Sequence, residues 1–254
     1  MKKTTTKSRQ LAFILTIMIL AASLRTPIAG VGSLLSIIRT DLIASGTTLG
    51  LLTSIPLFLF AIVSPLAAIA GRKLGIGRAI LASLCIVMVG ILVRSYSGAA
   101  GLFIGTAILS FGIGAVNVLC LTLIKLRSVP QKIGMATSLF GTTIAVTSTT
   151  SVAVSVPIAK VIGWRHTLAV WLILVVLAII VWGIQHRRPE NQLSAQDSTQ
   201  KVSLKRLLST PLAWQVTFFV GCYALIYFCV AGWFPTILQS RGFSMENAAM
   251  STYN

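Results

Sequence analysis

The stretch that decides the fold is residues 11–38, LAFILTIMILAASLRTPIAGVGSLLSII. It is apolar along its whole length except for Arg25 and scattered hydroxyl residues. A helix needs about 20 apolar residues to cross the roughly 30 Å hydrocarbon core of a bilayer, so this stretch is long enough. The apolar run continues past Arg25, and no small-residue cleavage pattern follows it. We therefore expect a retained membrane span and not a signal peptide.

Six further segments have the length and apolar character of a span or nearly so. They are residues 48–70, 77–93, 99–124, 135–159, 167–184 and 214–238. The composition agrees, because 56% of the 254 residues are hydrophobic and only 10% are charged. A water-soluble domain of this length carries many more charges. We predict an all-α integral membrane protein with seven spans, embedded in a lipid bilayer.

Basic residues outnumber acidic ones by 21 to 4, but they lie in short clusters between apolar runs, which argues against a nucleic-acid partner. Cytoplasmic loops of membrane proteins hold the excess of Lys and Arg. One set of alternate segments holds Lys2, Lys3, Lys7, Arg9, Arg72, Lys73, Arg78, Lys125, Arg127, Lys132, Arg187, Arg188, Lys201, Lys205 and Arg206. The opposite set holds Arg39, Arg94, Lys160, Arg165 and Arg241. We therefore expect a cytoplasmic N-terminus and an external C-terminus.

Cys85, Cys120, Cys222 and Cys229 all lie in predicted spans and show no metal-ligand spacing. We expect no disulfide, metal or cofactor from them. No Asp or Glu lies inside a predicted span, so the sequence offers no carboxylate relay for protons.

The only long polar segment, residues 185–210, predicts a central cytoplasmic loop between two membrane units. Residues 1–184 would form a six-helix half. Residues 211–254 would hold the seventh span and the start of an eighth, as an incomplete second half.

Several short patterns occur in a fixed order along the chain. They are LRTP at 24–27, VGSLL at 31–35, IRTDL at 38–42, GRKLG at 71–75, GAVNVL at 114–119, GWR at 163–165 and WFPTIL at 233–238. Together they resemble the cyanate permease and nitroimidazole transporter family of the major facilitator superfamily. The resemblance implies twelve helices in two halves that rock about a central substrate site. On that plan the chain has a complete N-terminal bundle and one helix of the second. We expect a C-terminally truncated copy that does not transport by itself.

Arg25 is the first candidate for substrate binding. A charge within a span costs several kcal/mol unless it faces a cavity or a partner, and Pro27 interrupts the helix just beyond it. A site on the substrate pathway would explain Arg25. Alternatively, the Arg25 side chain reaches the outer headgroups, or it bonds to backbone carbonyls as a structural contact. The sequence leaves these alternatives open.

Further candidates for substrate contact are polar residues in apolar runs: Asn117, Thr143, Thr147, Tyr223 and Tyr227. An interhelical hydrogen bond explains Asn117 equally well. The hydroxyls of Thr143 and Thr147 can instead bond to backbone carbonyls, and Tyr223 and Tyr227 can instead serve helix packing. The loop residues Gly71, Arg72, Lys73 and Arg78 predict a gating and topology loop, since no strand precedes them as in a nucleotide-binding motif.

The leading functional hypothesis is a secondary transporter of a small solute in a bacterial inner membrane. Arg25 without an internal carboxylate favours a small anion such as cyanate. An exporter of a neutral nitroimidazole-like compound is the alternative. A seven-helix receptor matches the span number but normally has an external N-terminus. The sequence contains no cluster of His, Asp, Glu or Cys residues with catalytic spacing, so we do not expect an enzyme.

Overall fold

The computed structural model describes residues 2–42, 46–186 and 209–241. All regular structure in these ranges is α-helical, which confirms the predicted all-α fold. Two compact units divide the chain, Met1–Gln192 and Leu193–Asn254. The first unit contains α1 (Lys2–Leu42), α2 (Gly46–Leu74), α3 (Ile76–Tyr96), α4 (Gly98–Arg127), α5 (Pro130–Ile162), α6 (Trp164–Val170) and α7 (Leu172–His186). The second contains α9 (Pro211–Ser240).

Six helical stretches in the described residues are long and apolar enough to cross a membrane. They are Ala12–Leu42, Gly50–Leu74, Ile76–Tyr96, Gly98–Arg127, Pro130–Ile162 and Trp164–Gln185. They match the first six predicted spans in order, although most extend a turn or more beyond the predicted bounds. The last one combines α6 and α7. The seventh predicted span, residues 214–238, falls within α9.

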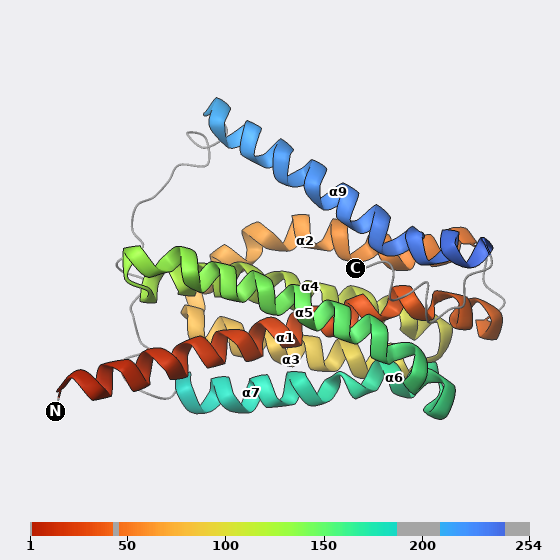
Figure 1. Ribbon diagram of the computed structural model, residues 1–254, viewed down its shortest axis with the longest axis horizontal. Coiled ribbons are helices and arrows are strands. Elements are labelled where there is room, and N and C mark those ends of the chain that lie inside the picture. The colour runs from red at the N-terminus through yellow and green to blue at the C-terminus, as the bar shows by residue number, and fades with distance from the viewer. Residues whose placement is uncertain (1, 43–45, 187–208, 242–254) are drawn as a thin grey trace. The chain divides into compact units, whose positions relative to one another are not determined.

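The spans of the first unit run up and down between two ends (Figure 1). At one end Gly75, with φ of 81°, joins α2 to α3, and Ser128 and Val129 join α4 to α5. At the other end Ser97 joins α3 to α4, and Gly163, with φ of 80°, joins α5 to α6. We call these the Gly75 end and the Gly163 end. The positive φ angles at both glycines suit residues without a Cβ atom.

The α3–α4 contact is the most extensive helix pair of the unit, and glycines bring the two backbones together. A Cβ atom built on Gly90 would lie 2.7 Å from Cα of Leu109. One built on Gly105 would lie 2.5 Å from Cα of Arg94. Such small residues allow close helix approach in membranes, where van der Waals packing replaces the hydrophobic effect. The register of α3 on α4 is therefore set by positions that exclude any side chain.

The remaining helices pack around this pair. Helix α1 lies mainly against α5, α2 lies against α4, and α7 contacts both α1 and α3. Trp182 of α7 is almost fully buried, and its Nε1 atom donates a hydrogen bond of 2.9 Å to the carbonyl oxygen of Gly77. This bond fixes α7 to the start of α3 at the Gly75 end.

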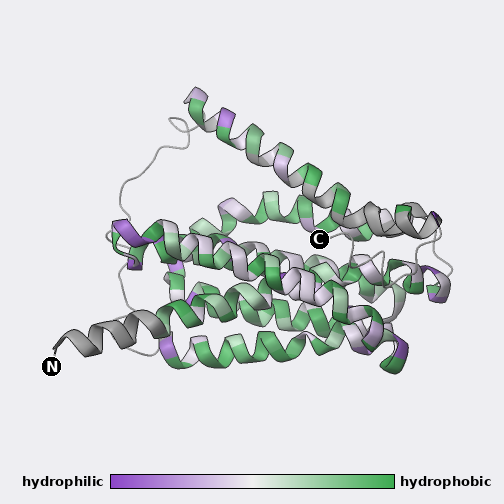
Figure 2. Ribbon diagram, viewed as in Figure 1, coloured by the Kyte–Doolittle hydropathy of each residue, from purple (hydrophilic) through white to green (hydrophobic). Residues whose placement is uncertain are grey.

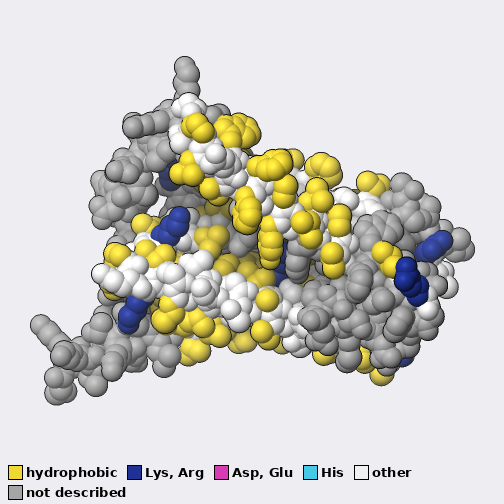
Figure 3. Space-filling model, turned by 45° about the horizontal axis from the view of Figure 1, so that its top comes forward, with side chains coloured by type: hydrophobic (Ala, Val, Ile, Leu, Met, Phe, Trp, Pro, Cys, Tyr) yellow, Lys and Arg dark blue, Asp and Glu magenta, His cyan; other side chains and the backbone are white. Residues whose placement is uncertain are grey.

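Apolar side chains also cover the outside of the bundle. Phe58 is 72% exposed and Val161 is 84% exposed, and many other large apolar residues of these helices share this exposure. Figure 2 shows apolar residues along the middle of the helices, and Figure 3 shows apolar side chains over much of one face. A surface of this kind needs lipid around it, because water-soluble monomers rarely expose large contiguous apolar patches.

Candidate functional site

Arg25 lies in the middle of α1 and is half-buried. The two residues that follow it, Thr26 and Pro27, are buried. Proline lacks the backbone N–H group, so the carbonyl oxygen of Ser23 loses its usual helical donor at this point. The structure therefore combines a cation with a weakened stretch of helix, as the sequence indicated.

Two neighbouring helices donate hydrogen bonds to this stretch of α1. The Oγ atom of Ser151, on α5, donates to the carbonyl oxygen of Thr26 at 2.8 Å. The Nη1 atom of Arg94, on α3, donates to the carbonyl oxygen of Pro27 at 2.7 Å. Consecutive carbonyl groups of α1 thus receive donors from two different helices. Sequence analysis did not identify either donor.

The position of Arg94 corrects the charge count made from the sequence, which placed this residue in a loop on the outer side. Arg94 lies in the last turn of α3 and is only 1% exposed. Its Nε and Nη2 atoms have no hydrogen-bond partner among the described residues. The predicted span ended at residue 93, whereas α3 continues for three more residues, to Tyr96. The close approach of α4 at Gly105 then covers Arg94.

Ser151 lies within the membrane-spanning part of α5. Ser151 follows Lys132 by 19 residues, or roughly 28 Å of helix, and precedes Lys160 by 9 residues, or roughly 13 Å. The bond from Ser151 to Thr26 puts this part of α1 at the same level. Arg25 therefore lies close to the middle of the span, displaced by about a turn of α5 toward the Gly163 end.

The candidate residues of α4 and α5 have different surroundings. Asn117 is exposed on the bundle surface. Thr143 and Thr147 are half-buried, and their Oγ1 atoms donate to carbonyl oxygens of their own helix, Leu139 at 2.8 Å and Thr143 at 2.7 Å. These intrahelical bonds do not connect α5 to Asn117. A shared site of Arg25, Asn117 and these threonines stays a prediction.

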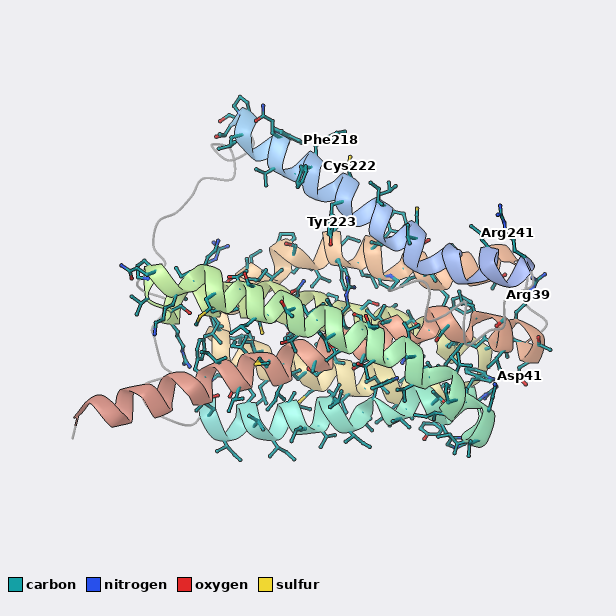
Figure 4. All side chains as sticks on the ribbon, in the orientation of Figure 1. Arg39, Asp41, Phe218, Cys222, Tyr223 and Arg241 are labelled. Atoms are coloured by element: carbon teal, nitrogen blue, oxygen red, sulfur yellow. The ribbon has the colours of Figure 1, made fainter. Side chains whose placement is uncertain are left out.

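The candidates of the second unit lie on α9. The side chain of Tyr223 is 66% exposed and is labelled in Figure 4 beside Phe218 and Cys222. Tyr227 belongs to the same helix, but its side chain lies outside the described residues.

The predicted gating and topology loop is the tight connection around Gly75. Arg72 and Lys73 are exposed in the last turn of α2, where positive charge favours the negative end of the helix dipole. Arg78 is exposed near the start of α3. Gly71 is buried, and a Cβ atom there would lie 2.7 Å from Cδ2 of Leu119 on α4. Glycine at 71 thus permits close packing of α2 on α4.

Two of the family-like patterns meet at the Gly163 end. The Nε1 atom of Trp164 donates a hydrogen bond of 3.0 Å to Oδ2 of Asp41, which is labelled in Figure 4. The guanidinium carbon of Arg165 lies 4.9 Å from the centre of the Trp164 ring. The GWR segment therefore fastens the start of α6 to the end of α1, a contact between residues 123 positions apart.

Removing this indole donor tests the fastening. We expect Trp164→Phe to lower the free energy of unfolding by about 1 kcal/mol or somewhat more, because it removes one hydrogen bond and puts a phenyl ring in place of the larger, buried indole. The measurement is thermal unfolding of the purified chain in detergent. Asp41→Ala should cost a similar amount, and the double variant should cost little more than either. Fully additive losses would contradict a shared bond.

No group of three His, Cys, Asp or Glu side chains in the described part of the chain could hold a metal ion. The cysteines at 85, 120, 222 and 229 are free thiols.

Comparison with known proteins supports a transporter. The family profile described as Major Facilitator Superfamily matches residues 11–253. Over 236 residues the chain is 36% identical to the "Uncharacterized transporter YycB" of Bacillus subtilis (strain 168), covering 91% of this chain and 57% of that protein. Over 241 residues it is 36% identical to the "2-nitroimidazole transporter" of Escherichia coli (strain K12), covering 94% of this chain and 60% of that protein.

Solved structures share the fold. A D-xylose-proton symporter superimposes with a TM-score of 0.70 at 16% identity, covering 96% of this chain and 64% of that chain. The tetrameric protein PepTSo2 gives a TM-score of 0.63 at 14% identity, covering 91% of this chain and 50% of that one. The chain thus spans only part of the length of these proteins. The relatives are transporters and give no support to a seven-helix receptor. The protein belongs to the Major Facilitator Superfamily.

Proposed function

We propose that residues 1–254 form the N-terminal six-helix bundle and the first helix of the second bundle of a secondary transporter for a small solute. On this proposal residues 1–184 make one wall of the central site, residues 185–210 form the central loop, and 211–254 begin the opposite wall. The observation that carries the proposal is the half-buried Arg25, placed beside the proline-interrupted segment of α1. Substrate sites of such transporters lie between the two halves at interrupted helices.

The proposed solute carries a negative charge or a strong hydrogen-bond acceptor. Asp41 is the one acidic residue in the described ranges, and it bonds to Trp164 at the Gly163 end. A guanidinium group in a low-dielectric setting attracts anions and donates to oxygen acceptors. The nitro group of a nitroimidazole presents such oxygens, and the name of the E. coli relative favours this class. Cyanate is the second candidate, because Arg25 suits a small anion.

The proposed location is a bacterial inner membrane with a cytoplasmic N-terminus. Arg72, Lys73 and Lys132 lie exposed at the Gly75 end. With Arg94 buried, the Gly163 end keeps Arg39, Lys160 and Arg165. In the predicted topology the extra basic residues of the N-terminal and central segments are on the same side as these three, and the positive-inside rule then makes that side cytoplasmic.

A chimera tests the role of Arg25. Residues 1–254 replace the matching 60% of the E. coli 2-nitroimidazole transporter, and cells that lack the native protein are assayed for transport of 2-nitroimidazole and of cyanate. We expect saturable transport of at least one solute. Arg25→Ala should lower it about 10- to 100-fold per transporter, as expected for one charged hydrogen bond in a dry site.

The controls separate binding from folding. Arg25→Lys keeps the charge and should retain part of the transport. Arg165→Ala removes an arginine at the Gly163 end and should leave transport close to that of the parent. If Arg25→Ala transports like the parent at equal membrane abundance, the assignment of Arg25 to the solute site is wrong.

A further inference from the structure

The two hydrogen bonds to Thr26 and Pro27 lie in a dry layer of the bundle. Ser151 is 0% exposed, Thr26 is 2% exposed and Arg94 is 1% exposed. The bonds come from α5 and α3 and measure 2.8 and 2.7 Å. Both reach the segment that directly follows Arg25. Arg25 directly precedes these two residues in α1, so the contacts that fix the orientation of this segment also fix the orientation of Arg25.

Helix α1 needs support at this place. A proline inside a helix removes one backbone hydrogen bond and costs about 3 kcal/mol relative to alanine, so the helix bends or turns there more easily. Successive residues of a helix are rotated by about 100°, so donors to consecutive carbonyls approach from different sides. Ser151 and Arg94 therefore restrict both the rotation of α1 and its shift along the helix axis.

Arg94 is costly for a purely structural contact. Burying a guanidinium group within a membrane bundle costs several kcal/mol, and a leucine would fill the same space without this cost. Its backbone is fixed by Gly105, because a Cβ atom there would lie 2.5 Å from Cα of Arg94. Nε and Nη2 have no described partner, so the bond to Pro27 is the interaction that the structure gives this side chain.

We propose that Arg94 is a positioning residue that holds the proline-interrupted segment of α1, and with it Arg25, in the orientation that faces the solute. This inference rests on the proposed role of Arg25 in solute binding. Arg94 is buried among α1, α3 and α4 and does not itself touch the solute. Ser151 is the second support of the same segment, from α5.

Thiol accessibility tests the positioning without any solute. In the chain with Cys85, Cys222 and Cys229 changed to serine, Arg25→Cys is labelled with a water-soluble maleimide in lipid nanodiscs. The buried Cys120, at 0% exposure, stays. Adding Arg94→Leu should change the labelling rate at position 25 by about fivefold, the factor that corresponds to one net hydrogen bond. Arg94→Lys keeps a donor and should stay near the parent rate.

A serine pair gives a matched comparison on α5. Ser151→Ala removes the bond to Thr26 and should change the labelling rate by at least about twofold, whereas Ser148→Ala removes a buried hydroxyl with no described partner and should not. If Arg94→Leu does not fold, this pair and Arg94→Lys decide the question. Parent-like rates in Arg94→Leu or, failing that, in Ser151→Ala would overturn the proposal.

The outcome is separable from that of the proposed function. In the chimera, Arg94→Leu should lower transport and Arg94→Lys should restore it. Suppose labelling changes as expected but Arg25→Ala transports normally. Then the support of α1 by Arg94 stands, the assignment of Arg25 to the solute fails, and the proposed purpose of this positioning falls with it.

Discussion

Replacement of Gly105 by leucine is expected to prevent the bundle from folding. A Cβ atom at this position would lie 2.5 Å from Cα and 2.6 Å from Cβ of Arg94, so the backbone of α3 itself would have to shift. Overpacking of a core usually costs about 1–3 kcal/mol, and contact with backbone raises this cost. The variant should also displace the guanidinium of Arg94 from Pro27. We expect loss of the monodisperse peak in size-exclusion chromatography.

The matched control for this substitution is Gly141→Leu. Gly141 lies inside α5, is exposed, and has no heavy atom within 4 Å of an added Cβ atom. Leucine is also the better helix former, so this variant should fold like the parent. If Gly105→Leu gives the parent elution profile and unfolding temperature, the close α3–α4 contact does not govern the packing of the bundle.

Expression of residues 1–254 alone should give no saturable solute uptake. Alternating access requires two bundles that rock against each other about a shared site, and this chain spans 57–60% of its relatives' length. The measurement compares uptake or efflux of 2-nitroimidazole and cyanate by cells that produce residues 1–254 with that by cells that produce the chimera. Both sets of cells lack the native transporter.

The comparison depends on equal amounts of membrane-inserted protein, which immunoblots of washed membranes report. The expected difference is complete loss of the saturable component in cells that produce residues 1–254. Saturable transport by this chain without a second polypeptide would contradict the two-bundle requirement. It would favour instead an assembly in which two copies of the chain supply both walls of the site.

The six spans of the first unit could be predicted from the sequence because bilayer thickness alone demands long apolar helices. No knowledge of packing was needed. The ends were less predictable: α5 begins at Pro130 and not at residue 135, and α4 continues to Arg127. Backbone hydrogen bonding carries a helix past the hydrocarbon into polar turns, and proline is tolerated in the first turn. Hydropathy does not report this extension.

The contacts around Arg25 could not be predicted in the same way. Arg94 looks like a loop residue until α4 is placed, because Gly105 is what lets α4 cover it. Ser151 and Thr26 are 125 positions apart in the sequence, and the bond between them depends on how α1 and α5 are aligned side by side. Hydropathy reports how deep a residue lies but carries no information on which side of a helix meets which neighbour.

The other site residues remain predictions for a similar reason. Asn117 is exposed on the surface of the bundle. Exposure in the first unit does not distinguish a position that faces the second bundle from one that faces lipid. Thr143 and Thr147 satisfy their hydroxyls within α5, a common behaviour of threonine in membrane helices that requires no solute. Assigning these residues to the solute site requires the structure of the second bundle, because that bundle would form the other wall of the site.

The location of Arg94 in the last turn of α3 also bears on how the protein is assembled during synthesis. While α3 alone enters the bilayer, the long side chain can extend to the nearby headgroups, so its charge adds little to the cost of insertion. The charge becomes dry only when α4 packs through Gly105 and α1 offers the carbonyl of Pro27. Helix association therefore buries this guanidinium. The packing of the newly made α4 is the step that transfers it from the headgroup region into the protein interior.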